Sequence, residues 1–234
     1  MKRFYKNAIV MKSEFESNYY ILLDENPLKT PSGSIVEVSS LYLAEAISEE
    51  WLIRTDQATL SSMPLTQLAV TAIDLIKPDI NFYANKIAAY GNTDLVCYRA
   101  SSPDSLVSQQ LAVWQPLIDW LSENFSLPLS ATTSLSPVSQ PLDTLKGLHN
   151  IVMKYSVFEL AGLGSATMAS GSLVIALALC TGHIDVKTAY EASFLDEIWQ
   201  NEKWGYDEEI ETRQKNVHKD LEVASLFIDL YQKS

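Results

Sequence analysis

The chain has few of the residues that build disulfide frameworks and metal centres. Its 234 residues include two cysteines, Cys97 and Cys180, and three histidines, and no C-x-x-C or H-x-x-x-H spacing occurs. Disulfide scaffolds of secreted proteins and zinc sites both need several such residues close together. We therefore expect a reducing compartment, no disulfide framework and no bound metal.

Basic residues are also scarce. Lys and Arg total 17 against 29 Asp and Glu, so the formal net charge is −12. Proteins that bind nucleic acid need a basic surface to neutralise phosphates, and anionic membranes likewise attract basic segments. The composition therefore argues against a nucleic-acid partner and against adhesion to a membrane.

Long apolar runs are missing as well. The stretch Leu160–Gly182 carries no charge, but glycines and several Ser and Thr residues interrupt it and leave only Leu173–Cys180 continuously apolar. A transmembrane helix needs about 20 predominantly apolar residues in a row. The pattern predicts a buried core helix of a soluble protein and no membrane insertion.

Motifs for nucleotide binding and nucleophilic catalysis are absent too. The sequence has no G-x-x-x-x-G-K-[ST], no G-x-G-x-x-G after a strand and no G-x-S-x-G. The histidines at positions 149, 183 and 218 are far apart, and none belongs to a recognisable motif. We expect surface or helix-capping roles for them, no catalytic residues, no ATP site and no cofactor.

The elements that are present divide the chain into two parts. Tyr19–Leu23 is rich in β-forming residues, Ser34–Val38 alternates polar and apolar residues, and a helix capped by Ser39 or Ser40 is expected to run to about Trp51. These elements predict a β-rich N-terminal domain over residues 1–60 with one helix.

From Pro64 onward the apolar period is helical. Pro78 is expected to end or break the first helix, Gly91 to cap the next, and Pro116 to kink or split a third whose apolar stripe includes Val107 and Leu111. Residues 126–141 are rich in Pro, Ser and Thr and predict a long loop. Further helices are expected at about 142–155, 158–168, 170–181, from Asp185 to about Trp204, and from near Asp207 to about Gln232. The fold class is therefore α+β, with a larger all-helical C-terminal domain over residues 61–234.

One segment is unusually acidic. Asp185–Glu211 holds nine acidic and two basic residues, a local charge of −7, together with Trp199, Trp204 and Tyr206. Exposed tryptophans among carboxylates are typical of protein-binding surfaces. The alternative is that both tryptophans face the core while the acids face water, and helical periodicity alone favours this second interpretation.

Several segments follow one another in a characteristic order. They are Met63–Ala69, Thr71–Asp74, Tyr90–Arg99, Trp114–Trp120, Ser170–Leu179, Leu195–Gln200 and Trp204–Gly205. Together they resemble a known family of assembly chaperones. The family acts on the catalytic head of ATP synthase, the F1-ATPase, and binds its alpha subunit; its members occur in mitochondria and related bacteria. The resemblance covers nearly the whole chain.

The resemblance implies a non-enzymatic chaperone. Such a protein binds the unassembled ATP synthase alpha subunit, prevents its aggregation and is displaced by the beta subunit during assembly. Asp196, Glu197, Trp204 and Gly205 match the family pattern in the acidic segment and are the candidate partner-binding residues. The implied location is the cytoplasm of a bacterium, or the mitochondrial matrix in a eukaryote, although no transit peptide is recognisable.

Two other functions stay open at this point. An enzyme that uses the acidic segment, such as a hydrolase with paired carboxylates, would need a deep pocket joining Asp196 or Glu197 to Tyr98 or Arg99. An interaction module for another basic partner would need only the acidic surface. Asp196 or Glu197 could also pair within the chain and hold two helices together.

Overall fold

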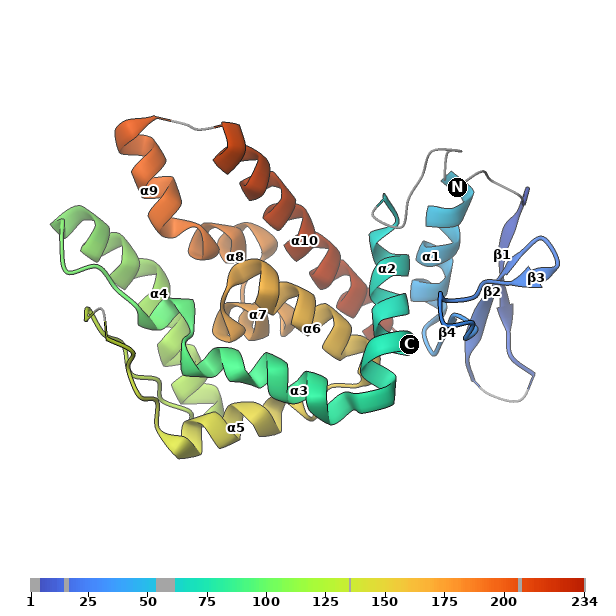
Figure 1. The fold of residues 1–234 in the computed structure, drawn as a ribbon, viewed down its shortest axis with the longest axis horizontal. Coiled ribbons are helices and arrows are strands. Elements are labelled where there is room, and N and C mark those ends of the chain that lie inside the picture. The colour runs from blue at the N-terminus through green and yellow to red at the C-terminus, as the bar shows by residue number, and fades with distance from the viewer. Residues whose placement is uncertain (1–4, 15–16, 54–61, 135, 206–207, 234) are drawn as a thin grey trace. The chain divides into compact units, whose positions relative to one another are not determined.

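The computed structural model describes residues 5–14, 17–53, 62–134, 136–205 and 208–233. It divides the chain into two compact units. Unit 1 comprises Met1–Ile80, Ser156–Gly162 and Leu226–Ser234, and unit 2 comprises Asn81–Tyr155 and Leu163–Ser225. The ribbon in Figure 1 shows strands near the N-terminus and helices over the rest of the chain, as the predicted α+β class requires.

Unit 1 contains a four-stranded antiparallel sheet centred on one strand. The strands are β1 (Ala8–Lys12), β2 (Tyr19–Leu23), β3 (Asn26–Pro27) and β4 (Glu37–Val38), and β2 pairs with each of the others. The predicted strand at Tyr19–Leu23 is confirmed. The one predicted at Ser34–Val38 is shorter, because Lys29 and Ile35 form only an isolated bridge beside the turn at Thr30–Gly33.

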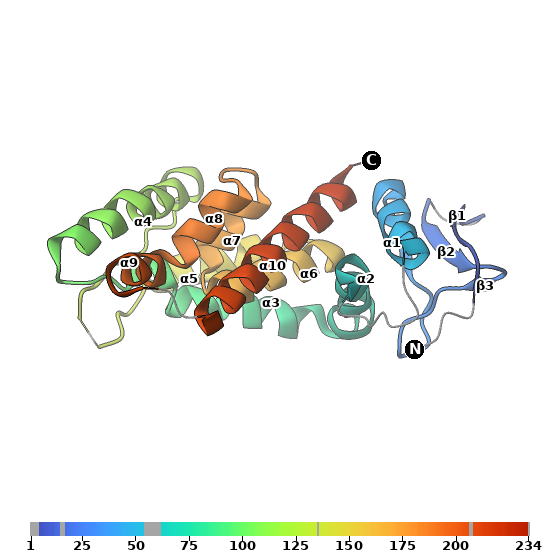
Figure 2. The same ribbon diagram turned by 90° about the horizontal axis from the view of Figure 1, so that it is seen from above.

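Helix α1 (Leu41–Ile53) covers one face of this sheet (Figures 1 and 2). Its buried residues Leu43, Ala44 and Ile47 are fully enclosed. Ser40 caps the helix, as predicted, by accepting a hydrogen bond from the Leu43 N–H at 3.4 Å. The layer between α1 and the sheet therefore forms part of the core of unit 1.

The helix that starts at Pro64 does not stop at Pro78. It begins as α2 (Pro64–Thr71), widens into a π-helical turn at Ala72–Ile76 and tightens into a 3-10 turn at Lys77–Asp79 before α3 (Ile80–Ala88). Proline has no N–H to donate to the carbonyl four residues earlier, so the helical hydrogen-bond pattern must change around it. The expected break is thus a change of helix type.

Glu50 fixes the start of α2 from the preceding helix. Its carboxylate accepts hydrogen bonds from the backbone N–H groups of Leu65 and Thr66, both at 2.8 Å, and from the Thr66 hydroxyl at 2.7 Å. The first N–H groups of a helix have no partner inside the helix, and a carboxylate there also suits the helix dipole. A side chain of α1 therefore caps α2.

The remaining helices carry most of unit 2. They are α4 (Asp104–Phe125), α5 (Leu142–Val152), α6 (Val157–Ser170), α7 (Leu173–Cys180), α8 (Val186–Ser193), α9 (Leu195–Trp204) and α10 (Glu208–Gln232). Every residue of α7 is buried, which confirms the predicted core helix. In the part of the chain that the structure describes, no helix is both long and apolar enough to cross a membrane.

Pro116 was expected to kink or split α4, and the helix is continuous through it, so of these two alternatives the split is wrong. Pro116 and Ala112, whose carbonyl loses its partner, are both exposed, and water can satisfy that carbonyl. The buried stripe also differs from the predicted one. Leu111 is 55% exposed, whereas Gln110 is 1% exposed.

Two further helix boundaries differ from the predicted ones. Gly91 is not a left-handed cap but lies buried in the 3-10 turn Ala89–Asn92, where a Cβ atom would stand 2.5 Å from the Leu148 Cδ1 atom. The single helix expected from Asp185 to Trp204 is two helices, α8 and α9, that meet at the buried Phe194. The predicted cap is confirmed, since Asp185 accepts a hydrogen bond from the Thr188 N–H at 2.8 Å. The expected start of the last helix, Asp207, lies outside the described residues.

A buried carboxylate joins two distant segments of unit 2. Asp94, which is 0% exposed, accepts hydrogen bonds from the Ser172 hydroxyl at 2.5 Å and from the N–H groups of Val174 at 3.1 Å and Val96 at 3.3 Å. Burial raises the pKa of Asp94 to about 6, against the opposing effect of these hydrogen bonds. Asp94 therefore attaches the 3-10 turn Leu95–Cys97 to the start of α7.

Candidate functional site

The four candidate residues lie on one short helix and its end. Asp196 and Glu197 are in the first turn of α9, Trp204 is its last residue and Gly205 follows. Both carboxylates are half-buried. The helix therefore places an acidic group at its start and an aromatic one at its end.

Asp196 takes part in a hydrogen-bond chain inside unit 2. Its Oδ1 atom accepts a hydrogen bond from the Gln110 Nε2 atom at 2.7 Å, and Gln110 Oε1 accepts one from the Ala100 N–H at 2.7 Å. Gln110 is almost fully buried, so both of its polar ends need partners. Asp196 thus attaches α9 to α4 and to the segment before it.

Glu197 has a different environment. Within the described part of the chain it makes no hydrogen bond or ion pair. A carboxylate in the first helical turn is stabilised by the N-terminal end of the helix dipole. The carboxylate of Glu197 has no hydrogen-bond or ion-pair partner among the described residues.

The two tryptophans of α9 face different surroundings. Trp199 is 7% exposed and Trp204 is 75% exposed, with their rings edge to face at a centroid distance of 5.7 Å. The expectation that both would face the core is wrong for Trp204. A buried ring supports the exposed one, and large exposed aromatic side chains commonly anchor protein–protein contacts.

Gly205 ends the helix. Its φ is +94°, and its N–H donates to the Asn201 carbonyl at 2.9 Å. A residue with a Cβ atom rarely adopts this conformation. Gly205 therefore fixes where α9 stops and places Trp204 at the exposed end of the helix.

Part of the acidity of this segment is compensated locally. Lys187 lies 3.8 Å from Glu191, and Lys215 lies 2.6 Å from Glu211, in both cases one helical turn away. Exposed pairs of this kind contribute little stability, but they reduce the local field. Tyr206 and Asp207 of the predicted acidic segment lie outside the described residues.

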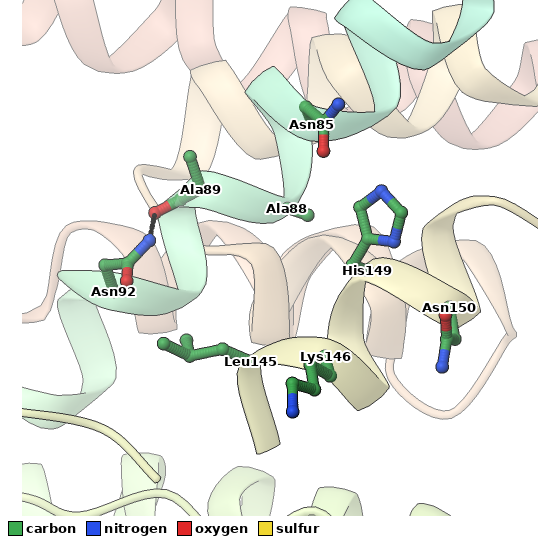
Figure 3. A pocket seen from close by; sticks show the side chains of 8 residues that line it. All are labelled: Asn85, Ala88, Ala89, Asn92, Leu145, Lys146, His149 and Asn150. Carbon is green, nitrogen blue, oxygen red and sulfur yellow. Dashed lines mark hydrogen bonds between the residues drawn. The ribbon is translucent and has the colours of Figure 1, made fainter. Parts of the chain in front are cut away.

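Two of the pockets formed by the described residues lie elsewhere in unit 2. The larger, of about 510 Å³, opens between α3 with its following 3-10 turn and α5 (Figure 3). Its lining residues are Asn85, Ala88, Ala89, Asn92, Leu145, Lys146, His149 and Asn150. The second, of about 300 Å³, lies between α8 and α10 and is lined by Tyr190, Glu211, Gln214, Lys215 and His218. Neither contains Asp196 or Glu197, and the larger contains no carboxylate.

The geometry required by the hydrolase alternative is not observed among the described residues. Arg99 directs its Nε atom to the Val96 carbonyl at 3.4 Å, and Tyr98 forms a backbone bridge with Thr132. Asp196 bonds Gln110 instead of either residue. The residues described here also contain no group of three or more His, Cys, Asp or Glu that could hold a metal ion.

The histidines take structural positions. His183 stacks on Trp120 at a centroid distance of 4.8 Å, and His218 lies 3.6 Å from the Glu222 carboxylate one turn away. His149 lines the larger pocket. None of these contacts brings a histidine beside a nucleophilic side chain, and the capping roles expected for the histidines stay a prediction.

Sequence reasoning missed Gln110 as part of the site. The signal was available, because Gln110 stands four residues from both Leu106 and Trp114 on the buried stripe of α4. A polar residue in such a stripe needs a buried partner. Its partner Asp196, 86 positions away, could not be identified from one sequence.

Comparison with known proteins gives concordant results. The family model described as ATP12 chaperone protein matches residues 2–122. The mitochondrial protein atp12 of Schizosaccharomyces pombe is 23% identical over 216 residues, which is 87% of this chain and 74% of that protein. The crystal structure of Atp12 from Paracoccus denitrificans is 35% identical with a TM-score of 0.93, covering 99% of this chain and 98% of that one.

A further solved structure, the Atu1473 protein of Agrobacterium tumefaciens, is 32% identical with a TM-score of 0.92 and covers 97% of this chain and 85% of that one. Sequence and fold thus agree over nearly the full length. The family model alone spans more than half of the residues, and the relatives that carry a functional name are called chaperones or Atp12. The chain belongs to the ATP12 chaperone family.

Proposed function

We propose that this protein is an assembly chaperone for the catalytic head of ATP synthase. It binds the unassembled alpha subunit, prevents its aggregation and is displaced by the beta subunit, without catalysing a reaction. The observation that carries the proposal is the exposed Trp204 at the end of an acidic helix, in a chain of the ATP12 chaperone family.

The physics of assembly supports this role. A subunit outside its complex exposes apolar surface that its neighbour normally covers, and such surface aggregates. A chaperone must cover the surface yet release it to the native neighbour, so its affinity must be lower than that of the final interface. A small contact built on one aromatic anchor and a few carboxylates fits this requirement.

The candidate residues divide into two roles in this proposal. Trp204 and Glu197 contact the alpha subunit, the tryptophan through its exposed ring and the carboxylate through Arg or Lys of the partner. Asp196 and Gly205 position them, since Asp196 attaches α9 through Gln110 and Gly205 ends the helix. The same proposal places the protein where alpha subunit awaits assembly, in the bacterial cytoplasm or the mitochondrial matrix.

The decisive experiment removes the aromatic anchor. Alpha subunit diluted from denaturant is mixed with the chaperone, and its aggregation is followed by light scattering. We expect Trp204→Ala to need at least about tenfold more chaperone for the same protection, because a hot-spot aromatic is worth about 2 kcal/mol or more.

The matched control is Leu142→Ala. Leu142 is 72% exposed on α5 of the same unit, so its truncation removes a comparable exposed apolar side chain. Both variants should melt at the temperature of the natural protein. Full protection by Trp204→Ala would remove this residue from the interface, and failure of the natural protein to protect alpha subunit would refute the proposed function.

A further inference from the structure

The sheet of unit 1 has an apolar face opposite α1. Ala8, Ile21 and Leu23 face the helix and are at most 5% exposed. Side chains alternate between the two faces of a strand, so their neighbours point the other way. Those neighbours are Ile9, Met11, Tyr20 and Leu22. Ile9 is 46% exposed and Met11 is 40% exposed.

These side chains form a continuous surface. Ile9 is directly opposite Leu22, which in turn is opposite Pro27, and Met11 is opposite Tyr20 in the next row on the same face. Cross-strand neighbours on one face are in contact range. The surface therefore spans β1, β2 and β3, with its most exposed members on β1.

Among the described residues, strand β1 pairs with β2 alone and is therefore an edge of the sheet. The Asp24 N–H donates to the Asn7 carbonyl at 3.0 Å, and the Ser13 N–H donates to the Asn18 carbonyl at 2.8 Å. These bonds place Asn7 and Ser13 in hydrogen-bonded pairs with the neighbouring chain. Hydrogen-bonded and non-bonded pairs alternate along an antiparallel ladder, so the odd-numbered residues of β1 bond to β2. The even-numbered residues direct their N–H and C=O groups away from β2.

Two residues of this edge lack backbone partners. The Ala8 carbonyl accepts a hydrogen bond from the Ser48 hydroxyl at 3.0 Å, but within the described ranges the N–H and C=O groups of Val10 and Lys12 have none. Natural edges are usually blocked by proline, charges or a bulge. Here the only charged side chain of β1 is Lys12, at its end.

We propose that this edge and the adjoining apolar face bind an extended segment of the client subunit as an added β-strand. The inference rests on the proposed function and assigns a second contact with the alpha subunit, in a different unit from Trp204. The unpaired groups of Val10 and Lys12 specify the occupant. The occupant is a segment in β conformation whose backbone N–H and C=O groups, two residues apart, bond to Val10 and Lys12. Its side chains at alternate positions are apolar and extend the face formed by Ile9 and Met11.

The first test alters the edge without breaking the sheet. Val10→Pro removes an N–H that points away from β2, so the ladder with β2 keeps its bonds, as at edge positions where proline is tolerated. Val10→Thr is the matched control, since it keeps the N–H and the β-branched shape. Met11→Glu places a charge on the apolar face. In the aggregation assay with alpha subunit we expect Val10→Pro to lose at least about fivefold in protection, the equivalent of one hydrogen bond. Met11→Glu should lose at least as much, because its charge would have to be buried against an apolar side chain of the client, and Val10→Thr should lose none.

The second test needs no variant and decides the matter if Val10→Pro does not fold. Amide hydrogen exchange of the natural protein is measured alone and in complex with alpha subunit. The amides of Val10 and Lys12 should exchange at least about tenfold more slowly in the complex, because each gains a hydrogen bond. A complex in which both amides exchange as in the free protein overturns the inference while leaving the proposed function standing.

Two other outcomes separate the alternatives. Slower exchange of these amides at raised chaperone concentration, without alpha subunit, would mean that a second copy of this chain occupies the edge, and would overturn the inference. If the natural protein forms no complex with alpha subunit, the proposed function fails and this inference fails with it.

Discussion

Replacing the buried Asp94 by asparagine tests whether a carboxylate in the core of unit 2 titrates near pH 6. Its folded-state pKa of about 6 lies above the ordinary value of 3.8, so the folded protein holds this proton more tightly than the unfolded chain. The contribution of Asp94 to stability is thus fully present below about pH 4 and is lost as the pH rises through about 6. Asparagine has no such proton.

The magnitude follows from the size of the shift. One pKa unit corresponds to about 1.4 kcal/mol, so the natural protein gains on the order of 1–2 kcal/mol from this group between pH 7.5 and pH 5, and a further gain of similar size as the pH falls below 4. Asp94→Asn gains nothing. The variant is also destabilised at every pH, because its amide nitrogen must face donors from Ser172, Val174 or Val96.

The assay is urea unfolding of both proteins at pH 5 and pH 7.5. We expect the difference in unfolding free energy between them to be on the order of 1–2 kcal/mol larger at pH 5. Other titrating groups are common to both proteins and cancel. Ser172→Ala keeps the carboxylate but removes a donor, so it should steepen the pH dependence. A difference that stays the same at both pH values would refute the reasoning.

Two further predictions concern local packing and capping. Gly91→Ala should lower the free energy of unfolding by about 1–3 kcal/mol, measured by urea titration, because the new Cβ atom would overlap Leu148; no loss would show that α5 shifts freely. Glu50→Ala should lower it by about 1–2 kcal/mol through loss of the cap on Leu65 and Thr66, and Glu50→Gln should recover part of that; equal losses in the two would contradict a capping role.

The sequence was sufficient for elements whose signal is local. The strand at Tyr19–Leu23, the core helix at Leu173–Cys180 and the cap at Asp185 all follow from residue pattern alone, and all three are present. The order of a small sheet before a helical part, and with it the fold class, was predictable for the same reason. Periodicity and turn chemistry are properties of neighbouring residues.

Features that depend on distant partners were not predictable. Trp199 and Trp204 lie on one short helix, yet one is buried and the other exposed, since burial depends on which elements surround α9. Gln110 and Asp196 form a side-chain hydrogen bond although they lie 86 positions apart in the sequence. The change of helix type around Pro78 likewise depends on packing, because proline signals only that the usual hydrogen bond is missing.

Unit 1 combines segments from both ends of the chain, and this has a consequence for how the protein folds during synthesis. Its core includes Phe227, whose ring stacks on Phe158 at 6.3 Å; the Phe158 ring also stacks on Tyr231 at 5.2 Å, and the Ser40 hydroxyl donates to the carbonyls of Leu230 and Lys233. These partners are synthesised about 190 residues after α1 begins. The N-terminal sheet and helix therefore cannot reach their final packing while the ribosome is still translating the middle of the chain. The N-terminal part of this chaperone therefore stays incompletely packed until the residues of α10 have been synthesised. Only then can the complete protein bind a client.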